Sequence, residues 1–181
     1  MTDASALILA GGKATRFGGA AKHALVIAGR TIFERQVDVL APRVAEILVS
    51  GVEVAGYRSV RDPIEGAGPL AGIAAGLAAA QTPWLLVVAG DMPYLTGTVI
   101  DALLAARAPE LDAVGLRLND LPEPLCCLLQ VRTLAAVERR LAAGRFKASG
   151  LLTDEGLAVL WLTNADPAAL RNLNSPADLP E

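Results

Sequence analysis

Aromatic side chains are scarce in this chain of 181 residues. They make up 4% of the sequence, whereas hydrophobic residues, mostly Ala, Leu and Val, make up 53%. Proteins that bind single-stranded nucleic acid stack its bases on aromatic rings, so this composition argues against that class. The net charge of −3 also argues against a nucleic-acid or anionic-membrane partner. We therefore expect no nucleic acid and no membrane among the partners.

Residues that build metal clusters or act as nucleophiles are equally few. The chain has one histidine, His23, and two cysteines, Cys126 and Cys127. The cysteines are adjacent in a predicted strand, so their side chains should point to opposite faces. Without a C-x-x-C spacing, we interpret them as buried apolar side chains in a reducing compartment, and His23 as a loop residue that could touch phosphate.

Charged residues are missing from residues 66 to 90, a stretch long enough to span a membrane. Its glycines, Pro69 and the Gln81-Thr82-Pro83 turn instead divide it into a buried helix and a buried strand. The N-terminus carries Asp3 and no basic segment, so it does not resemble a signal peptide. We therefore expect a cytoplasmic protein.

The most informative segment is a glycine-rich loop after an apolar strand. Residues 7–18 are LILAGGKATRFG, and Lys22 follows. Glycine lets a backbone turn sharply and approach a ligand. Exposed N–H groups together with Arg16 and Lys22 would favour an anion. The segment predicts a nucleoside triphosphate site, and the alternative is an ordinary tight turn.

Two common phosphate-binding motifs are excluded. A Walker A loop needs Gly-Lys followed by Ser or Thr, and the chain contains neither Gly-Lys-Ser nor Gly-Lys-Thr. The nearest match to the dinucleotide fingerprint, at residues 66–72, is one residue too long and does not directly follow a strand. The remaining pattern is L-A-G-G-x-x-x-R-x-G-x-x-x-K.

Strand and helix patterns alternate along the chain, without a linker or repeat. This order predicts a single domain over residues 1–181, with a Rossmann-like three-layer α/β/α fold and a mostly parallel sheet. Thr31 and Glu34 form a capping box at the first helix. Strands are expected at 5–10, 44–49, 84–89, 112–117, 125–130 and 157–162, with a looser segment at 53–61. Helices are expected from Thr31 to about 40, at 69–80, from Thr96 or Thr98 to near 107, at 132–143 and at about 147–153.

Three turns that could bind a ligand should meet at one edge of this sheet. Gly11-Gly12, Ser50-Gly51 and Gly90-Asp91 each follow a predicted strand, and open α/β sheets bind ligands beyond the carboxyl ends of their strands. A carboxylate there can hold Mg²⁺ together with substrate phosphates. We therefore predict Asp91 as the metal ligand, the alternative being a turn aspartate that bonds its own backbone.

A metal, a triphosphate and two cations favour in-line displacement at phosphorus. An acceptor phosphate oxygen would attack the α-phosphorus while Arg16 and Lys22 stabilise the negative charge. The phosphate acceptor is already ionised, so no general base is needed. Asp62 is a candidate for binding guanine or ribose, or is simply a residue at a strand end before Pro63.

Four motifs, in order along nearly the whole chain, resemble the MobA family of nucleotidyltransferases. The glycine-rich opening is similar to the family's nucleotide loop. The three other motifs are GPLAGI at 68–73, AGDMPY at 89–94 and NLNSPADL at 172–179. The resemblance implies transfer of GMP from GTP to molybdopterin, with Mg²⁺ as cofactor and release of pyrophosphate.

The resemblance also assigns residues. It implies a GTP site formed by Leu9, Ala10, Gly11, Gly12, Lys22, Ser50, Asp62 and Asp91, and it places the acceptor near Asn172 and Asn174. Arg145 and Lys147 could meet the pterin phosphate or belong to a solvated helix start. A molybdoenzyme or its maturation chaperone is an implied partner.

Some alternatives stay open. Ser50 stands where the family often has Asn, which could shorten a contact to the nucleotide. The loop Ala10-Gly11-Gly12 favours guanine over cytosine, because relatives that transfer CMP tend to have A-A-G. The remaining alternatives are use of CTP, a phosphorylated corrinoid or deazaflavin acceptor, and a non-catalytic nucleotide-binding adaptor.

Overall fold

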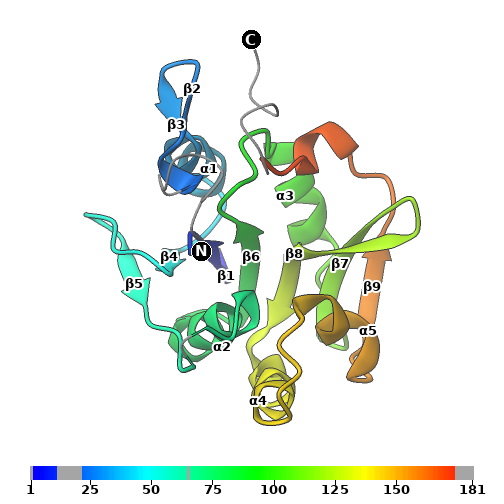
Figure 1. Cartoon of the computed structure of the whole chain (residues 1–181). Helices are drawn as coiled ribbons and strands as arrows, with labels where there is room; N and C mark the ends of the chain where they lie inside the picture. Colours follow the sequence, from blue (N-terminus) through cyan, green and yellow to red (C-terminus); the bar gives the residue numbers. More distant parts are fainter. Residues whose placement is uncertain (1, 12–21, 65, 174–181) are drawn as a thin grey trace.

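A seven-stranded sheet with helices on both faces organises the protein (Figure 1). The computed structural model describes residues 2–11, 22–64 and 66–173. The seven strands lie in the order β5-β4-β1-β6-β8-β7-β9. Across these described residues, no helix has the length and apolar character that a membrane span requires.

The elements alternate largely as the sequence predicts. The sheet strands are β1 (Ala4–Leu9), β4 (Ile47–Ser50), β5 (Arg58–Val60), β6 (Trp84–Ala89), β7 (Ala113–Leu118), β8 (Leu121–Gln130) and β9 (Val159–Leu162), and a small hairpin is formed by β2 (Val26–Ile27) and β3 (Arg30–Thr31). The α-helices are α1 (Ile32–Leu40), α2 (Pro69–Ala79), α3 (Gly97–Ala105), α4 (Leu134–Ala142) and α5 (Leu151–Asp154). Short 3-10 helices are η2 (Lys22–Ala24), η3 (Val131–Thr133), η4 (Ala148–Gly150) and η5 (Pro167–Leu170).

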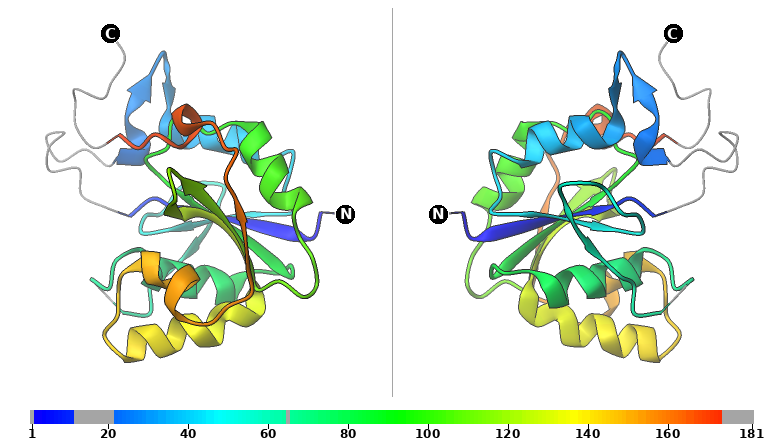
Figure 2. Two further views of the ribbon diagram at one scale, coloured as in Figure 1. Left: turned by 90° about the vertical axis from the view of Figure 1, so that its right-hand side faces the viewer. Right: turned by 90° about the vertical axis from the view of Figure 1, so that its left-hand side faces the viewer.

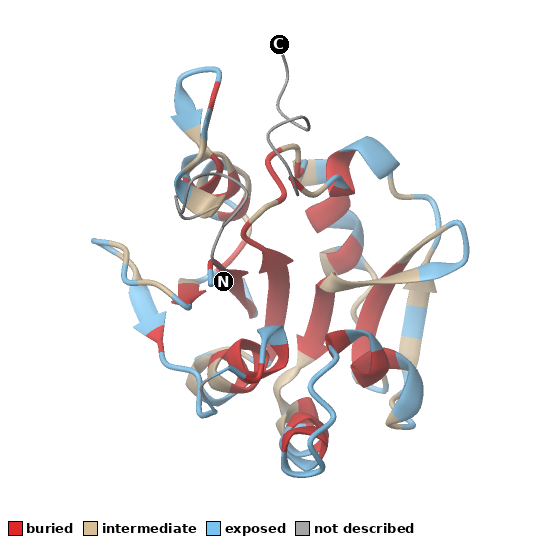
Figure 3. Cartoon of the chain, viewed as in Figure 1, coloured by how far each residue is buried: buried red, intermediate tan, exposed pale blue. Residues whose placement is uncertain are grey.

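The core has two layers, one on each side of the sheet. Figure 2 shows α1 and α3 over one face and α2, α4 and α5 over the other. Strand β6 contributes to both layers, because Leu86 and Val88 pack with the first group whereas Leu85 and Val87 pack with the second. In Figure 3 the central strands are accordingly buried, whereas β5 and β9 at the two edges are more exposed.

The predicted mostly parallel sheet is confirmed, with one inner strand reversed. Strand β8 runs antiparallel to both β6 and β7, whereas the other paired strands are parallel. The reversal follows from a two-residue hairpin at Asn119 and Asp120, whose φ angles are 49° and 64°. Turns of this type require positive φ at both positions, which Asn and Asp tolerate. Pairing therefore begins at Leu121, four residues before the predicted start at 125.

Several helix signals are confirmed and some boundaries differ. Thr31 and Glu34 form the expected capping box, and Pro69 is the first residue of α2. Thr96 occupies the N-cap of α3 but makes no side-chain capping bond. The helix expected at 147–153 is a 3-10 turn followed by the short α5, and β4 spans 47–50 instead of 44–49.

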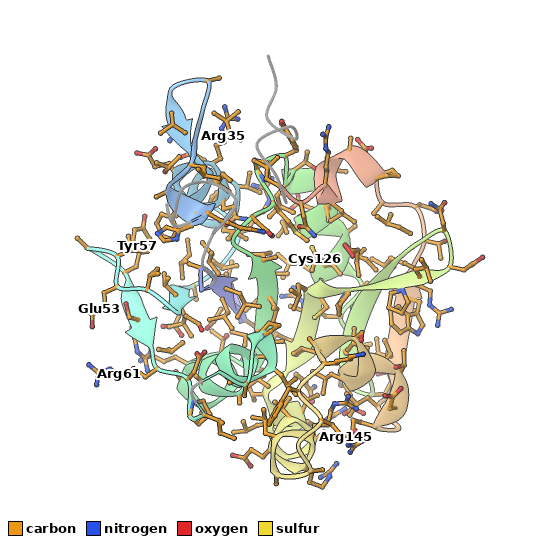
Figure 4. The ribbon with its side chains drawn as sticks, in the orientation of Figure 1. Arg35, Glu53, Tyr57, Arg61, Cys126 and Arg145 are labelled. Atoms are coloured by element: carbon orange, nitrogen blue, oxygen red, sulfur yellow. The ribbon has the colours of Figure 1, made fainter. Side chains whose placement is uncertain are left out.

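The two cysteines lie on opposite faces of β8, as predicted. Cys126, labelled in Figure 4, packs in the layer of α1 and α3, whereas Cys127 packs in the layer of α2 and α4. Both thiols are free and buried. Burial raises the pKa of both, that of Cys127 to about 12, which keeps them protonated at neutral pH.

Candidate active site

The carboxyl ends of three strands meet at one edge of the sheet, as the sequence predicts. Leu9, the last residue of β1, lies in register with Ser50 of β4 on one side and with Ala89 of β6 on the other. The chain therefore reverses its direction of strand addition at β1 (Figure 1). Such a switch point is the usual ligand site of an open α/β sheet.

The turns that follow these strands approach one another closely. The N–H of Ala10 donates to the carbonyl of Ser50 at 2.9 Å, and the N–H of Gly90 donates to the carbonyl of Leu9 at 3.0 Å. Gly51 has a φ of +88°, and a Cβ at this position would lie 2.3 Å from the Cα of Gly11. Only glycine at position 51 permits this approach, which brings the backbones after β1 and β4 together.

These turns surround a cavity of about 480 Å³. All of its polar or charged lining side chains belong to the residues that the sequence analysis selected, and the start of α2 completes one wall. The cavity is lined by Leu9, Ala10, Gly11, Lys22, Ser50, Asp62 and Asp91, with Gly68, Pro69 and Leu125 among its further residues. The structure therefore brings Gly11 and Lys22, described residues of the predicted phosphate site, together with the predicted acidic turn.

Lys22 and Asp91 form an ion pair in this cavity. The Nζ atom of Lys22 lies 2.9 Å from Oδ2 of Asp91, and the two side chains are 25% and 19% exposed. The lysine begins η2 and the aspartate follows β6, so the pair joins the loop after β1 to the turn after β6. A cation and a carboxylate are thus held together in the wall of the glycine-lined cavity.

Ser50 and Asp62 form a second polar pair. The hydroxyl of Ser50 donates to Oδ1 of Asp62 at 2.8 Å, which gives the exposed carboxylate a fixed partner. A neighbouring cavity of about 720 Å³ shares Asp62 with the first and is also lined by Glu53 and Arg61. Figure 4 shows these two side chains at the outer edge of the sheet, beside β5. The pair thus stands between two adjoining cavities.

The C-terminal segment contacts the acidic turn through its backbone. The N–H of Leu173 donates to the carbonyl of Asp91 at 2.9 Å. The Leu173 side chain is buried with Ile27 of the β2–β3 hairpin and Ile32 of α1. Asn172 is therefore held next to the site, although it does not line the cavity, and within the described part of the chain its buried Oδ1 has no hydrogen-bond partner.

The other predicted residues either lie outside the described part of the chain or do not line this cavity. Gly12, Arg16 and Asn174 lie outside the described residues. Arg145 pairs with Glu155 at 2.9 Å, and neither Arg145 nor Lys147 lines the cavity. Figure 4 shows Arg145 beside α4 and α5. The ring of His23 packs edge-on against Phe33, with centroids 6.4 Å apart.

Sequence reasoning missed Glu123. This half-buried residue lies on β8 where the register with β7 shifts, two residues before the cavity residue Leu125. Burial raises the pKa of its carboxyl, and the negative charge of Asp91 raises it further. The predicted strand begins at residue 125, so nothing in the pattern linked Glu123 to the Asp91 turn.

The donor set fits a magnesium ion held partly by substrate. Among the described residues, no three His, Cys, Asp or Glu side chains form a protein cage for a metal. Mg²⁺ typically takes one or two carboxylates and keeps waters and phosphate oxygens in its remaining positions. Asp91 offers a carboxylate whose Oδ2 meets Lys22, in a cavity with room for phosphates.

The fold and the site together define a nucleotidyltransferase. A glycine-lined turn after β1 faces a carboxylate after β6 across the switch point of the sheet, and a lysine joins the two. The sequence model of the family described as "MobA-like NTP transferase domain" matches residues 6–156. The chain belongs to this family of MobA-like NTP transferases.

Similar proteins span nearly its whole length. A molybdenum cofactor guanylyltransferase of Pseudomonas putida strain F1 is 32% identical over 97% of this chain and 95% of its own. A probable molybdenum cofactor guanylyltransferase of Opitutus terrae is 36% identical over 97% of this chain and 94% of its own. The crystal structure of molybdopterin-guanine dinucleotide biosynthesis protein A from Archaeoglobus fulgidus has a TM-score of 0.78 at 22% identity. It covers 96% of this chain and 94% of that one, and it supports the fold.

Proposed function

We propose that the protein transfers GMP from GTP to the phosphate of molybdopterin, forming the guanine dinucleotide form of the molybdenum cofactor. The observation that carries this proposal is the Lys22–Asp91 pair in the cavity beside the Gly11 turn. Relatives named guanylyltransferases, which match almost the whole chain, support the choice of nucleotide and acceptor.

The two adjoining cavities suggest how GTP lies. The triphosphate occupies the cavity between Gly11 and Asp91, where backbone N–H groups and Lys22 favour negative charge. The nucleoside extends past Asp62 into the neighbouring cavity. A carboxylate at that position accepts hydrogen bonds from a guanine edge or from ribose hydroxyls, and Ser50 orients it.

The reaction is an in-line displacement. An oxygen of the acceptor phosphate forms a bond to the α-phosphorus, the bond to the bridging oxygen breaks, and pyrophosphate leaves with that electron pair. Lys22, together with Arg16 by family resemblance, stabilises the charge that develops on these oxygens. Asp91 would hold Mg²⁺, which would supply further charge neutralisation on the phosphates.

The acceptor side is assigned to the C-terminal segment. Asn172 lies beside Asp91 through the Leu173 contact, and its buried side-chain oxygen has no hydrogen-bond partner among the described residues, which supports a role in holding this side of the site. The proposal includes Asn174 as a second amide there, a cytoplasmic site of action, and delivery of the product to a molybdoenzyme or its chaperone.

Substrate competition tests the proposal. The purified protein is incubated with Mg²⁺, molybdopterin and equal amounts of GTP and CTP, and pyrophosphate and the pterin dinucleotide are measured. We expect GTP to be consumed preferentially. Preferential use of CTP would replace guanylyl transfer by cytidylyl transfer. Turnover only with another phosphorylated acceptor would overturn the pterin assignment, and binding of GTP without any turnover would indicate an adaptor.

A further inference from the structure

Gln36 is a polar side chain buried in the middle of helix α1. It is 1% exposed and lies on the same helical stripe as Ile32 and Leu40, which are both fully buried. Its Nε2 atom donates to the carbonyl of Ala89 at 2.7 Å and to the carbonyl of Met92 at 3.2 Å. These two carbonyls flank the Gly90-Asp91 turn, so one side chain holds both ends of it.

The chemistry of the amide defines the arrangement. Both acceptors are carbonyl oxygens, so the NH₂ end of the side chain must face them, and its two hydrogens are both used. Within the described residues the buried Oε1 atom has no partner. Burying an incompletely bonded amide is unfavourable compared with an apolar side chain. The presence of Gln36 at this buried position is therefore explained by the turn whose two carbonyls it binds.

We infer that Gln36 is a positioning residue for Asp91. It fixes the backbone of the turn on the side of α1, whereas the N–H of Leu173 bonds the Asp91 carbonyl and Gly90 bonds the end of β1. The Lys22 ion pair constrains only the tip of the aspartate side chain. Gln36 is the side chain that orients the peptide units from which the carboxylate projects.

The functional part of this inference depends on the proposed function. A carboxylate that binds a metal–triphosphate must be held close to its productive position, because displacement of about 1 Å can lower a rate on the order of a hundredfold. When the amide is removed, the turn should open more often, and metal-dependent binding should weaken. Binding of the nucleotide without metal should change little.

The test compares Gln36→Met with Thr133→Val. Met keeps the unbranched length of Gln but donates no hydrogen bond. Thr133 is also buried, and its hydroxyl donates to the carbonyl of Gln130 at 2.8 Å, near the opposite end of β6 from Asp91. Each variant therefore loses buried side-chain-to-backbone bonding, but only the first loses it at the Asp91 turn.

Two readouts are measured on the full-length protein. Hydrogen exchange of the amides at 90–92 should accelerate roughly tenfold or more in Gln36→Met and stay unchanged in Thr133→Val. Mn²⁺ binding in the presence of GTP, followed by electron paramagnetic resonance, should weaken roughly tenfold to a hundredfold in the first variant alone. Metal-free GTP affinity should be equal in all three proteins.

The outcomes separate this inference from the proposed function. Unchanged exchange at 90–92 in Gln36→Met overturns the inference, as does acceleration of the same size in both variants. If the natural protein does not bind Mn²⁺ with GTP, the proposed function fails, and the exchange result alone decides whether Gln36 holds the turn. Should the Met variant not fold, Gln36→Asn, which keeps an amide too short to reach both carbonyls, is expected to show the same local acceleration.

Discussion

Lys22 and Asp91 are joined by an ion pair of 2.9 Å although 69 positions separate them in the chain. The pair connects Lys22, after β1 in the chain, to the turn after β6, and both side chains line the cavity. The positive charge of Lys22 suits the phosphates of a metal–triphosphate, and the negative charge of Asp91 suits its metal. The pair therefore supplies the first test of the proposed chemistry.

Asp91→Asn should fold normally and lose transfer. The amide keeps the size of the side chain but lacks the negative charge that holds a divalent metal, so we expect a fall in turnover of about 10²-fold or more. Pyrophosphate release measures the rate, and a thermal melt checks folding. Asp101→Asn is the matched control, since it removes the exposed carboxylate with which α3 pairs Arg43. Equal activity of the two variants would rule out the metal role.

Gly72→Ala should alter nucleotide binding through Ser50. A Cβ at position 72 would lie 2.4 Å from the Oγ of Ser50 and 2.8 Å from Cδ2 of Leu9. The hydroxyl must move, which disturbs its bond to Asp62, so we expect a higher KM for GTP together with a stability loss of about 1–3 kcal/mol.

Gly76→Ala separates the two effects of Gly72→Ala. Position 76 lies one turn further along α2, and a Cβ there would meet Cδ2 of Leu7 at 2.6 Å, away from Ser50. It should lower stability by a similar amount and leave KM unchanged. Steady-state kinetics and chemical unfolding of both variants provide the comparison, and an equal KM in the two would remove Ser50 from nucleotide binding.

Gly51→Ala should be far more damaging than Gly56→Ala. Both glycines have a positive φ, +88° and +85°, so either substitution introduces backbone strain of about 1–2 kcal/mol. At position 56 a Cβ meets nothing within 4 Å, whereas at position 51 it would lie 2.3 Å from the Cα of Gly11. Only Gly51→Ala should separate the two loops and weaken GTP binding, measured by calorimetry. Similar affinity in both variants would show that the close approach is unnecessary.

The strands that carry the site could be predicted because each is an apolar run ended by a small or acidic turn residue. Ser50 and Asp91 follow such runs, and parallel strands bring their carboxyl ends together. The continuous apolar pattern at 84–89 correctly predicted a strand buried on both faces. Local pattern and topology were therefore sufficient to locate the cavity.

Tertiary packing determines what the sequence could not predict. Gln36 interrupts the buried stripe of α1 between Ile32 and Leu40, which is a signal of a polar contact, but its acceptors depend on where α1 packs against the turn after β6. Strand β8 was predicted to start too late because Pro122 and Pro124 disfavour a central strand. The Asn119-Asp120 turn was the hairpin signal that favoured the earlier start.

Glu123→Gln should raise stability at neutral pH. Burial first, and then the charge of Asp91, raises the pKa of the Glu123 carboxyl in the folded protein. The folded state therefore binds this proton more tightly than the unfolded chain does. The stabilisation from the protonated form is present below the usual pKa of 4.5 and is lost as the pH rises through the higher folded value.

Glu34→Gln is the control with the opposite sign. Hydrogen bonds from the backbone and hydroxyl of Thr31 lower the pKa of Glu34, so its contribution is present above the usual pKa and is lost as the pH falls. Chemical unfolding between about pH 3.5 and 7.5 should show Glu123→Gln more stable than the natural protein and Glu34→Gln less stable near neutrality, and both differences should shrink in acid. If Glu123→Gln destabilises the protein at neutral pH, the ionised Glu123 carboxylate stabilises the folded state. Its burial near the charge of Asp91 then does not cost stability.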